Sequence, residues 1–360
     1  MVWVRLLEVR DLRNIRHAGL ELHPGLNVFA GRNAQGKTSI LEAVGFLARG
    51  RSFRTDETRG AIRRGADRLL ARGAAAEPRR EAALEVEVEP GRRRFRVDGR
   101  EVPAREYQGR LEVVVYSTDR LRVVRGSMRD RRQFLDRGAS ALWPAYRQVA
   151  RDFERVLAHR NVALGERRRD LAVWTEQFVD VGGRLRARRA AYVERLRSAL
   201  ACGRGGFSPG EERYDLRLAD EHSSPDEAEQ RHALGDAVAR AGSAELRAGR
   251  SLVGPHRDPV AATVDGAEAA EGASAGQARS LLLALAVATL AVYREETGAS
   301  AVALLDDLDS ELDEERVERL CREVASGGQA LVTTAHPAWV ARVAGLGRVF
   351  NVSAGEVRCA

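Results

Sequence analysis

The residues whose types and spacing best suit chemistry form one short glycine-rich stretch near the start of the chain. It fills every fixed position of the pattern Gly-x-x-x-x-Gly-Lys-[Ser/Thr] with Gly31, Arg32, Asn33, Ala34, Gln35, Gly36, Lys37 and Thr38, and Ser39 follows. In such a loop the backbone N–H groups close around phosphates, the lysine reaches the β and γ phosphates, and the threonine hydroxyl binds Mg²⁺. The pattern predicts a site for a nucleoside triphosphate and Mg²⁺.

The composition of the chain draws attention to the lysine of this loop. The sequence has 59 lysine and arginine residues, and Lys37 is the only lysine among them. A flat guanidinium cannot replace a compact ammonium inside a closed phosphate loop. The exception at this position favours a working phosphate loop over a chance glycine turn.

A phosphate loop needs a carboxylate partner, and two adjacent acids are placed to supply it. Asp306 and Asp307 follow the apolar stretch 301–305, which has the pattern of a buried strand. Asp306 would hold Mg²⁺ directly or through water, and Asp307 would orient and polarise an attacking water. The alternative is a helix cap or a solvated acidic turn.

A second anion site is predicted further along the chain. Ser274, Gly276 and Gln277 form a Ser-x-Gly-Gln turn at the start of a helix that continues through the apolar stretch 281–292. Such a turn presents a hydroxyl, backbone N–H groups and a helix dipole to an anion. A chain with two sites for a terminal phosphate would use the second on a partner's nucleotide.

The predicted elements place these residues on one sheet. Residues 25–30 have the pattern of a strand and 39–47 that of a helix, so the loop lies between them, and 329–334 is a further apolar strand. Strands alternating with helices at both ends of the chain predict one mixed α/β sheet assembled from the two ends. Other predicted elements are two or three strands within 2–30 around a turn at Arg13, a helix ending at Arg64, a hairpin of 82–88 and 92–97, and a strand at 111–116.

The middle of the chain has a different pattern. Long charged helices are predicted over 129–142, 145–164, 171–201 and 225–241, and 211–218 has the pattern of a strand. We therefore predict an α/β lobe from 1–126 and 250–360 that carries the phosphate loop, with 127–249 as an inserted, mostly helical second lobe. No heptad pattern long enough for an extended coiled coil is present.

Charge and cysteine content narrow the class of protein. The formal net charge is +7 and the pI is near 9.9, which favours nucleic acid over membrane as a partner, although a solvated arginine-rich surface would give the same values. Cys202, Cys321 and Cys359 are too far apart for a zinc motif and indicate a reducing compartment. The early charges at the N-terminus and the short apolar run 281–292 predict a cytoplasmic protein without a membrane span.

Taken together, the motifs resemble a known family. The phosphate loop, Ser274 to Gln277, Asp306-Asp307, the loop 310–313 and His336 resemble the ABC-type ATPase heads of chromosome-maintenance proteins. The stretches 27–38, 50–55, 131–136 and 252–258 narrow the resemblance to the RecF family, over essentially the whole chain.

The resemblance implies a fold and an activity. The fold would be an ABC-type ATPase head: a P-loop mixed sheet with flanking helices, an inserted helical lobe and no long coiled coil. ATP would drive homodimerisation on DNA, each nucleotide lying between the phosphate loop of one subunit and Ser274 of the other. His336 would sense the γ phosphate, and Arg13 would contact nucleotide or the partner subunit.

The resemblance also implies a cellular role. The protein would bind DNA in an ATP-dependent manner, with weak DNA-stimulated hydrolysis. It would act with RecR and RecO to direct RecA onto gapped DNA, in recombinational repair, replication restart and SOS induction.

Two positions depart from the ABC pattern. Tyr116 is followed by Ser117, Thr118 and Asp119, where ABC ATPases carry a glutamine and RecF-like chains tend to have Ser-Pro-Glu. The second acid is Asp307 where most of the superfamily has glutamate, and a shorter base fits slow hydrolysis. A role for Arg54 at the nucleotide stays open, and for His256 a core or turn role is favoured over catalysis.

The sequence disfavours three other functions. A transporter ATPase subunit is disfavoured because its signature would lie much closer to the phosphate loop than Ser274 lies to Thr38. A chromosome-condensing head is disfavoured because it would carry long heptad repeats. A DNA-binding protein with a dead site is disfavoured because the residues of the complete site are present together. DNA contact is predicted through arginines within 120–137 and 184–197, with backbone contacts and little sequence preference.

Overall fold

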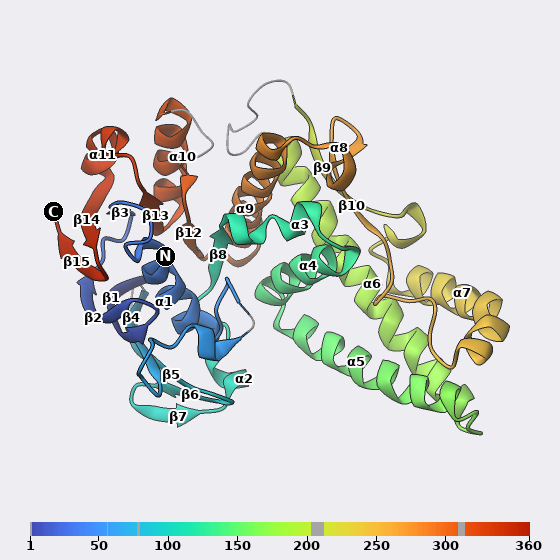
Figure 1. The fold of residues 1–360 in the computed structure, drawn as a ribbon. Coiled ribbons are helices and arrows are strands. Elements are labelled where there is room, and N and C mark those ends of the chain that lie inside the picture. The colour runs from blue at the N-terminus through green and yellow to red at the C-terminus, as the bar shows by residue number, and fades with distance from the viewer. Residues whose placement is uncertain (1, 56, 78–79, 203–211, 309–313) are drawn as a thin grey trace. The chain divides into compact units, whose positions relative to one another are not determined.

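The computed structural model describes the chain except residues 1, 56, 78–79, 203–211 and 309–313 (Figure 1). The fold divides into two compact units, one containing residues up to Arg120 together with Leu282–Ala360, and the other residues between Leu121 and Leu281. The predicted loop 310–313 lies outside the described residues.

A mostly parallel sheet in the first unit is built from both ends of the chain. Its strand order is β15-β14-β3-β13-β12-β8, and every pairing is parallel except that of β14 with β15. The strands are β3 (Leu26–Ala30), β8 (Val113–Tyr116), β12 (Val302–Leu305), β13 (Ala330–Thr334), β14 (Gly347–Ser353) and β15 (Glu356–Cys359). β12 and β13 are buried along their whole length, as their apolar sequences predict.

A second sheet of the same unit is antiparallel, so the prediction of one mixed sheet was incomplete. Its order is β2-β1-β4-β5-β6-β7. The strands are β1 (Trp3–Leu12), β2 (Ile15–Glu21), β4 (Leu69–Glu77), β5 (Arg80–Glu89), β6 (Arg92–Val97) and β7 (Arg100–Val102). Buried and exposed residues alternate along β2, because only one face of this sheet covers the core.

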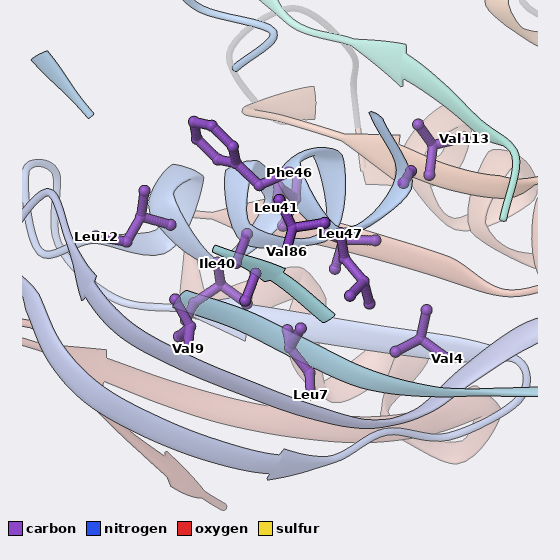
Figure 2. Close-up of a cluster of buried hydrophobic side chains, with 14 of the residues drawn as sticks. Val4, Leu7, Val9, Leu12, Ile40, Leu41, Phe46, Leu47, Val86 and Val113 are labelled. Atoms are coloured by element: carbon purple, nitrogen blue, oxygen red, sulfur yellow. The ribbon is translucent and has the colours of Figure 1, made fainter. Parts of the chain in front are cut away.

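Helix α1 (Lys37–Arg49) contacts strands of both sheets and carries much of the core between them. Figure 2 shows Ile40, Leu41, Phe46 and Leu47 of α1 in the same cluster of buried hydrophobic side chains as residues of β1, and all four are buried. Full burial of such a side chain contributes about 1.5–3 kcal/mol. The core therefore fixes the helix that begins at the phosphate loop.

The predicted helix ending at Arg64 is wrong. The structure has only the 3-10 turn η1 (Thr58–Gly60), after which Arg63 N donates to Asp11 O at 2.8 Å and Ile62 forms a bridge with Leu12. Pairing with the end of β1 replaces helical hydrogen bonds here. The other helices of this unit are α2 (Ala104–Tyr107), α10 (Glu314–Gly327) and α11 (Pro337–Val343), with 3-10 turns η2 (Thr118–Arg120) and η5 (Ala344–Leu346).

The second unit is mainly helical, and long helices lie close to where the sequence predicts them. It contains α3 (Arg122–Arg125), α4 (Met128–Leu142), α5 (Pro144–Gly165), α6 (Leu171–Ala201), α7 (Glu227–Ala248), α8 (Ala269–Gly272) and the 3-10 turn η3 (Asp220–His222). α6 packs against both α5 and α7. α7 continues seven residues beyond the predicted end, where Gly249 in the left-handed region ends it.

The second unit also contains a small sheet. Its order is β11-β10-β9, from β9 (Tyr214–Leu218), β10 (Val260–Val264) and β11 (Ala267–Glu268). β9 was predicted and β10 was not. β10 lies after the predicted lobe boundary at 249/250 but pairs with β9, which lies in the predicted insert. The position of the lobe boundaries therefore stays a prediction.

Helix α9 (Ala275–Thr297) connects the two units and is long and apolar enough to cross a membrane by length and composition. Within the apolar window, 67% of the residues are buried inside the protein. That burial is what a core helix of a globular protein shows.

Candidate nucleotide-binding site

The phosphate loop lies between β3 and α1, in the predicted order. Lys37 Nζ donates to Gly31 O at 2.7 Å and to Arg32 O at 3.0 Å. Gly36 has φ 110°, and a Cβ there would lie 2.8 Å from Asn14 Oδ1. A side chain at position 36 would therefore be both strained and blocked, which explains the glycine.

The two halves of the site are joined by hydrogen bonds to one carboxylate oxygen. Thr38 Oγ1 donates to Asp306 Oδ1 at 2.9 Å, and Thr333 Oγ1 donates to the same oxygen at 2.7 Å. Thr333 belongs to β13, which lies between β3 and β12 in the sheet. The sheet order thus brings together a hydroxyl and a carboxylate that are far apart in the sequence.

Asp306 is buried, and burial is the main cause that raises its pKa above the ordinary value. The hydrogen bonds from Thr333 and Thr38 oppose this shift, and the neighbouring charge of Asp307 adds to it. A buried carboxylate with a raised pKa gains from a cation placed beside it. Hydroxyl and carboxylate oxygens are the donors that Mg²⁺ prefers, so these residues fit the predicted metal.

Asp307 lines the same cavity in an unusual backbone conformation. Its φ is 58°, and its N–H donates to Thr333 Oγ1 at 2.8 Å. Aspartate is one of the few residues that adopt the left-handed region readily. Thr333 therefore holds both acids, and sequence reasoning missed it; the only signal was a polar residue in an apolar strand.

Behind the loop, an ion pair fixes the second turn of α1. The fully buried Glu42 accepts from Arg13 Nη2 at 2.8 Å and from Arg13 Nε at 3.0 Å, and Ser52 Oγ also donates to it. The hydrogen bond to Glu42 is the main cause that raises the pKa of Arg13. The Arg13 guanidinium also donates to Gly60 O. Arg13 lines the cavity while held by protein partners.

The region that departs from the ABC pattern also reaches the cavity. Thr118 and Asp119 both line it, and Asp119 Oδ2 accepts from Arg54 Nε at 3.2 Å. Arg54 Nη1 lies 4.0 Å from Glu42 Oε2. The segment after β8, where the sequence departs from the ABC pattern, thus brings a carboxylate paired with an arginine to the cavity.

The cavity has a volume of about 400 Å³. Of the residues predicted to bind ATP or metal, or to act in catalysis, those that line it are Arg13, Asn33, Ala34, Gly36, Lys37, Thr38, Ser39, Asp306 and Asp307. Gly31, Arg32, Gln35 and His336 do not line it. Sequence reasoning missed Asn14 and Thr333, which do, and left the roles of Arg54, Thr118 and Asp119 open.

The residues outside the lining occupy neighbouring positions. Asn14 Nδ2 donates to the backbone oxygen of Gln35 at 2.9 Å, and Ala354 N donates to Gln35 Oε1 at 2.6 Å. These two hydrogen bonds anchor the phosphate loop. His336 directly precedes α11 and follows β13, the neighbour of β3. Its N–H donates to Thr334 Oγ1 at 2.8 Å.

In the second unit, Ser274 and Gln277 form a reciprocal pair at the start of α9. Gln277 N donates to Ser274 Oγ at 3.1 Å, and Ser274 N donates to Gln277 Oε1 at 2.8 Å. This is a capping box, which satisfies two N-terminal N–H groups of the helix. Gln277 Nε2 also donates to Glu212 Oε1 at 2.9 Å. Of the predicted signature residues, Ser274 and Gly276 are exposed and Gln277 is partly buried, and hydrogen bonds hold Ser274 and Gln277 in place.

Two of the motif stretches combine into a buried charged network of the second unit. Arg186 makes two bonds to Asp258 at 2.6 and 2.7 Å, and Arg189 donates to Asp136 Oδ1 at 2.9 Å and to Pro255 O at 2.8 Å. Both arginines lie on α6 and both are buried. Arginines of a helix predicted to contact DNA therefore serve as structural partners of the 131–136 and 252–258 stretches.

His256 is half-buried beside aromatic side chains of this unit. Its ring packs near Phe153 and Phe178 with centroid distances of 6.1 and 6.2 Å. Burial is the main cause that lowers its pKa. The geometry supports the core role favoured from the sequence.

Comparisons with known proteins agree with this geometry. The chain matches the family model described as RecF/RecN/SMC N terminal domain over residues 3–358. The fold and the site define an ABC-type ATPase head. The first unit has a mostly parallel sheet, in which the phosphate loop is hydrogen-bonded to the acid that follows β12. The second unit is mainly helical, and the signature residues cap its helix α9.

Curated relatives narrow the class. A DNA replication and repair protein RecF from Symbiobacterium thermophilum is 36% identical over 354 residues, covering 92% of this chain and 91% of the relative. The RecF of Acidothermus cellulolyticus is 35% identical, covering 93% of this chain and 94% of the relative. The chain belongs to the RecF family.

Solved structures give the same result. The structure described as the recombination mediator protein RecF-ATP in the RecFOR pathway has a TM-score of 0.88 and 25% identity, covering 100% of this chain and 99% of that chain. An Smc head bound to the C-winged helix domain of ScpA has a TM-score of 0.58 at 14% identity, covering 99% of this chain and 97% of that chain, and shows the shared fold alone.

Proposed function

We propose that this chain is an ATP-dependent DNA-binding protein that hydrolyses ATP slowly and uses ATP as a switch. The observation that carries the proposal is the bond of 2.9 Å between Thr38 Oγ1 and Asp306 Oδ1. It places the hydroxyl of a phosphate loop and the carboxylate of a strand end at one point, beside Lys37. That donor set fits Mg²⁺ bound with a triphosphate.

The residues of the cavity divide the chemistry among them. Lys37 and the loop N–H groups hold the phosphates, Thr38 and Asp306 hold Mg²⁺, and Asp307 orients the attacking water. Bound Mg²⁺ neutralises charge on the phosphates. We assign to Asp119 the position of the absent glutamine, because it lines the cavity on the side that Arg54 holds.

We further propose an ATP-dependent homodimer. Ser274, Gly276 and Gln277 would bind the γ phosphate of the partner's ATP, and His336 would sense that of its own. The exposed capping box supports this role because its geometry is set before any partner arrives. A contact made only when ATP is present converts binding of a nucleotide into association of two chains.

The family supports a place in recombinational repair and replication restart in the cytoplasm. The chain would bind duplex DNA and single-strand/double-strand junctions without sequence preference, and would act with RecR and RecO to direct RecA to gapped DNA and support SOS induction. The named relatives are DNA replication and repair proteins, and a solved neighbour belongs to a RecFOR pathway.

The test is binding of gapped and blunt duplexes, with and without ATP, by the wild type and by Lys37→Met. ATP should tighten binding by the wild type, and the variant should lose that gain because it lacks the ammonium at the phosphates. The ratio of gapped to blunt binding reports junction recognition. Binding that ignores ATP in both proteins would contradict a switch that controls DNA.

A further inference from the structure

A second hollow lies beside the nucleotide cavity in the first unit, at the end of the β1–β2 hairpin. Its volume is about 750 Å³, and its cationic lining is Arg13, Arg59, Arg63 and Arg64. Asp67 and Glu89 also line it, and Glu89 lies 3.6 Å from Arg94. We call the hollow the arginine groove.

Two of these guanidinium groups are available to a ligand. Arg63 donates to Asp11 Oδ1 at 2.6 Å, but the side chains of Arg59 and Arg64 make no hydrogen bond or ion pair with any part of the chain that the structure describes. Both are exposed. Their turn is nevertheless fixed, because Arg63 N and Ile62 pair with the end of β1. The groove therefore presents unpaired cations on ordered backbone.

Arg13 lines both the arginine groove and the nucleotide cavity. Its guanidinium donates to Glu42 of α1 from Nη2 at 2.8 Å and from Nε at 3.0 Å. The third nitrogen, Nη1, donates to the backbone oxygen of Gly60, the residue that follows Arg59. α1 begins at Lys37. One rigid guanidinium thus connects the helix of the phosphate loop to the turn that carries Arg59.

We propose that the arginine groove binds backbone phosphates of DNA and that Arg13 couples this binding to the nucleotide cavity. The proposal rests on the proposed function, and names the site through which DNA is held. One guanidinium group can donate two parallel N–H groups to a phosphate, which fits the phosphodiester backbone of DNA. Among the described residues no aromatic side chain lines the groove, so the groove would contact the DNA backbone without stacking on bases.

The test compares three proteins that differ in charge in a controlled way. Arg59→Ala/Arg64→Ala removes two groove cations, and the matched control Arg105→Ala/Arg358→Ala removes two exposed arginines of the same unit outside the groove. Duplex DNA binding with ATP is measured from about 50 to 200 mM salt. ATP binding by each protein shows that the phosphate site remains folded.

The groove variant should bind DNA at least about tenfold more weakly at low salt, and the slope of log affinity against log salt should fall by about two. The control should keep most of the wild-type affinity and slope. Equal losses in the two variants would overturn the inference, since net charge alone would then explain them. So would unchanged DNA binding by the groove variant, which would leave the groove to another polyanion such as an acidic protein.

Failure of the proposed function is distinguishable from failure of the groove. If the wild type binds no DNA, both the proposed function and the groove proposal are refuted. If the wild type binds DNA with ATP and the groove variant binds it equally well, only the groove proposal is refuted. Coupling is tested with Arg13→Lys, whose single ammonium cannot span Glu42 and Gly60 as the fork does. The ratio of DNA affinities with and without ATP should fall toward one; an unchanged ratio would overturn the coupling.

Discussion

A single carboxylate oxygen joins the two halves of the candidate nucleotide site. Asp306 Oδ1 accepts from Thr38 and Thr333, and the same Thr333 hydroxyl accepts from the N–H of Asp307. The Thr333 hydroxyl therefore holds the side chain of Asp306 but the backbone of Asp307, although the two acids are adjacent in sequence. This arrangement supports the proposed division of roles, in which Asp306 binds the metal and Asp307 activates water.

The first prediction concerns Asp307. Asn adopts the left-handed backbone at φ 58° as readily as Asp, so Asp307→Asn should fold and bind ATP as the wild type does. Without a carboxylate to take a proton, hydrolysis should fall about 10²-fold or more. Steady-state phosphate release and a nucleotide-binding assay measure the two effects.

The control for this prediction is Asp307→Glu, which keeps the carboxylate and lengthens it. If the shorter base limits the rate, turnover should rise in this variant. Wild-type turnover by Asp307→Asn would remove Asp307 from the mechanism. Unchanged turnover by Asp307→Glu would refute the link between a short base and slow hydrolysis.

The second prediction concerns the pH dependence of stability through His256. Its pKa is lowered from 6.5 by burial, so the folded protein favours the neutral ring, while the unfolded chain protonates first as pH falls. The neutral ring of His256 therefore contributes its full stability above the pKa that histidine has in the unfolded chain. This contribution is lost as pH falls from that value through the lowered pKa of the folded protein. Phe153, Phe178, Ser251, Arg132, Arg257 and Asp258 are the groups that surround or influence the ring.

Denaturant melts at about pH 7.5 and about pH 5.5 measure the effect. His256→Gln should lose less stability between the two pH values than the wild type. The control His232→Gln changes a histidine whose side chain is 84% exposed, and should behave as the wild type. An unchanged pH dependence in His256→Gln would contradict the assignment.

At the scale of elements, close packing of α6 against α7 depends on adjacent glycines in α6. A Cβ at Gly183 would lie 2.8 Å from Arg231 N and 2.9 Å from Arg231 Cα, and one at Gly182 would lie 2.6 Å from Leu234. Backbone atoms of α7 cannot move aside as a flexible side chain can. The glycines that weaken α6 as an isolated helix thus allow the second unit to pack.

The third prediction follows from that contact. Gly183→Ala should destabilise the protein by about 1–3 kcal/mol, because overpacking exceeds the gain of about 1 kcal/mol in helix propensity. The matched control is Gly242→Ala in α7, where no atom lies within 4 Å of the added Cβ. That change should stabilise by up to about 1 kcal/mol. Chemical denaturation distinguishes the signs, and equal effects of both changes would refute the packing argument.

At the scale of the whole molecule, the proposed dimer needs residues from both units. The phosphate loop belongs to the first unit and the signature turn to the second. ATP binding and dimerisation should therefore be separable by mutation. The fourth prediction is that Ser274→Arg binds ATP as the wild type does and does not dimerise, because a long cation replaces the hydroxyl meant for the partner's phosphate.

The control is Ser127→Arg, which removes the serine of another capping box, that of α4 with Asp130. Each substitution loses a cap of about 1 kcal/mol, but only Ser274 belongs to the proposed interface. Sedimentation with and without ATP measures the dimer. An ATP-dependent dimer of Ser274→Arg would exclude the signature from the interface.

Local features of this protein can be predicted from its residue patterns. The phosphate loop, its strand and helix, and the acids after β12 could be predicted, because each depends on residues that are near one another in the chain. Most long helices were predicted within a few residues for the same reason. The family resemblance, confirmed by the relatives, rested on these local motifs.

Which distant residues share the site depends on how the strands pair in three dimensions. Thr333 acts there because β13, and no other strand, lies between β3 and β12, and Glu42 holds Arg13 because the β1–β2 turn meets α1. Strand order and sheet number depend on pairings between distant segments, which residue patterns in one sequence do not specify. For the same reason arginines that look alike in sequence become buried partners at Arg186 and Arg189 and exposed cations at Arg59 and Arg64.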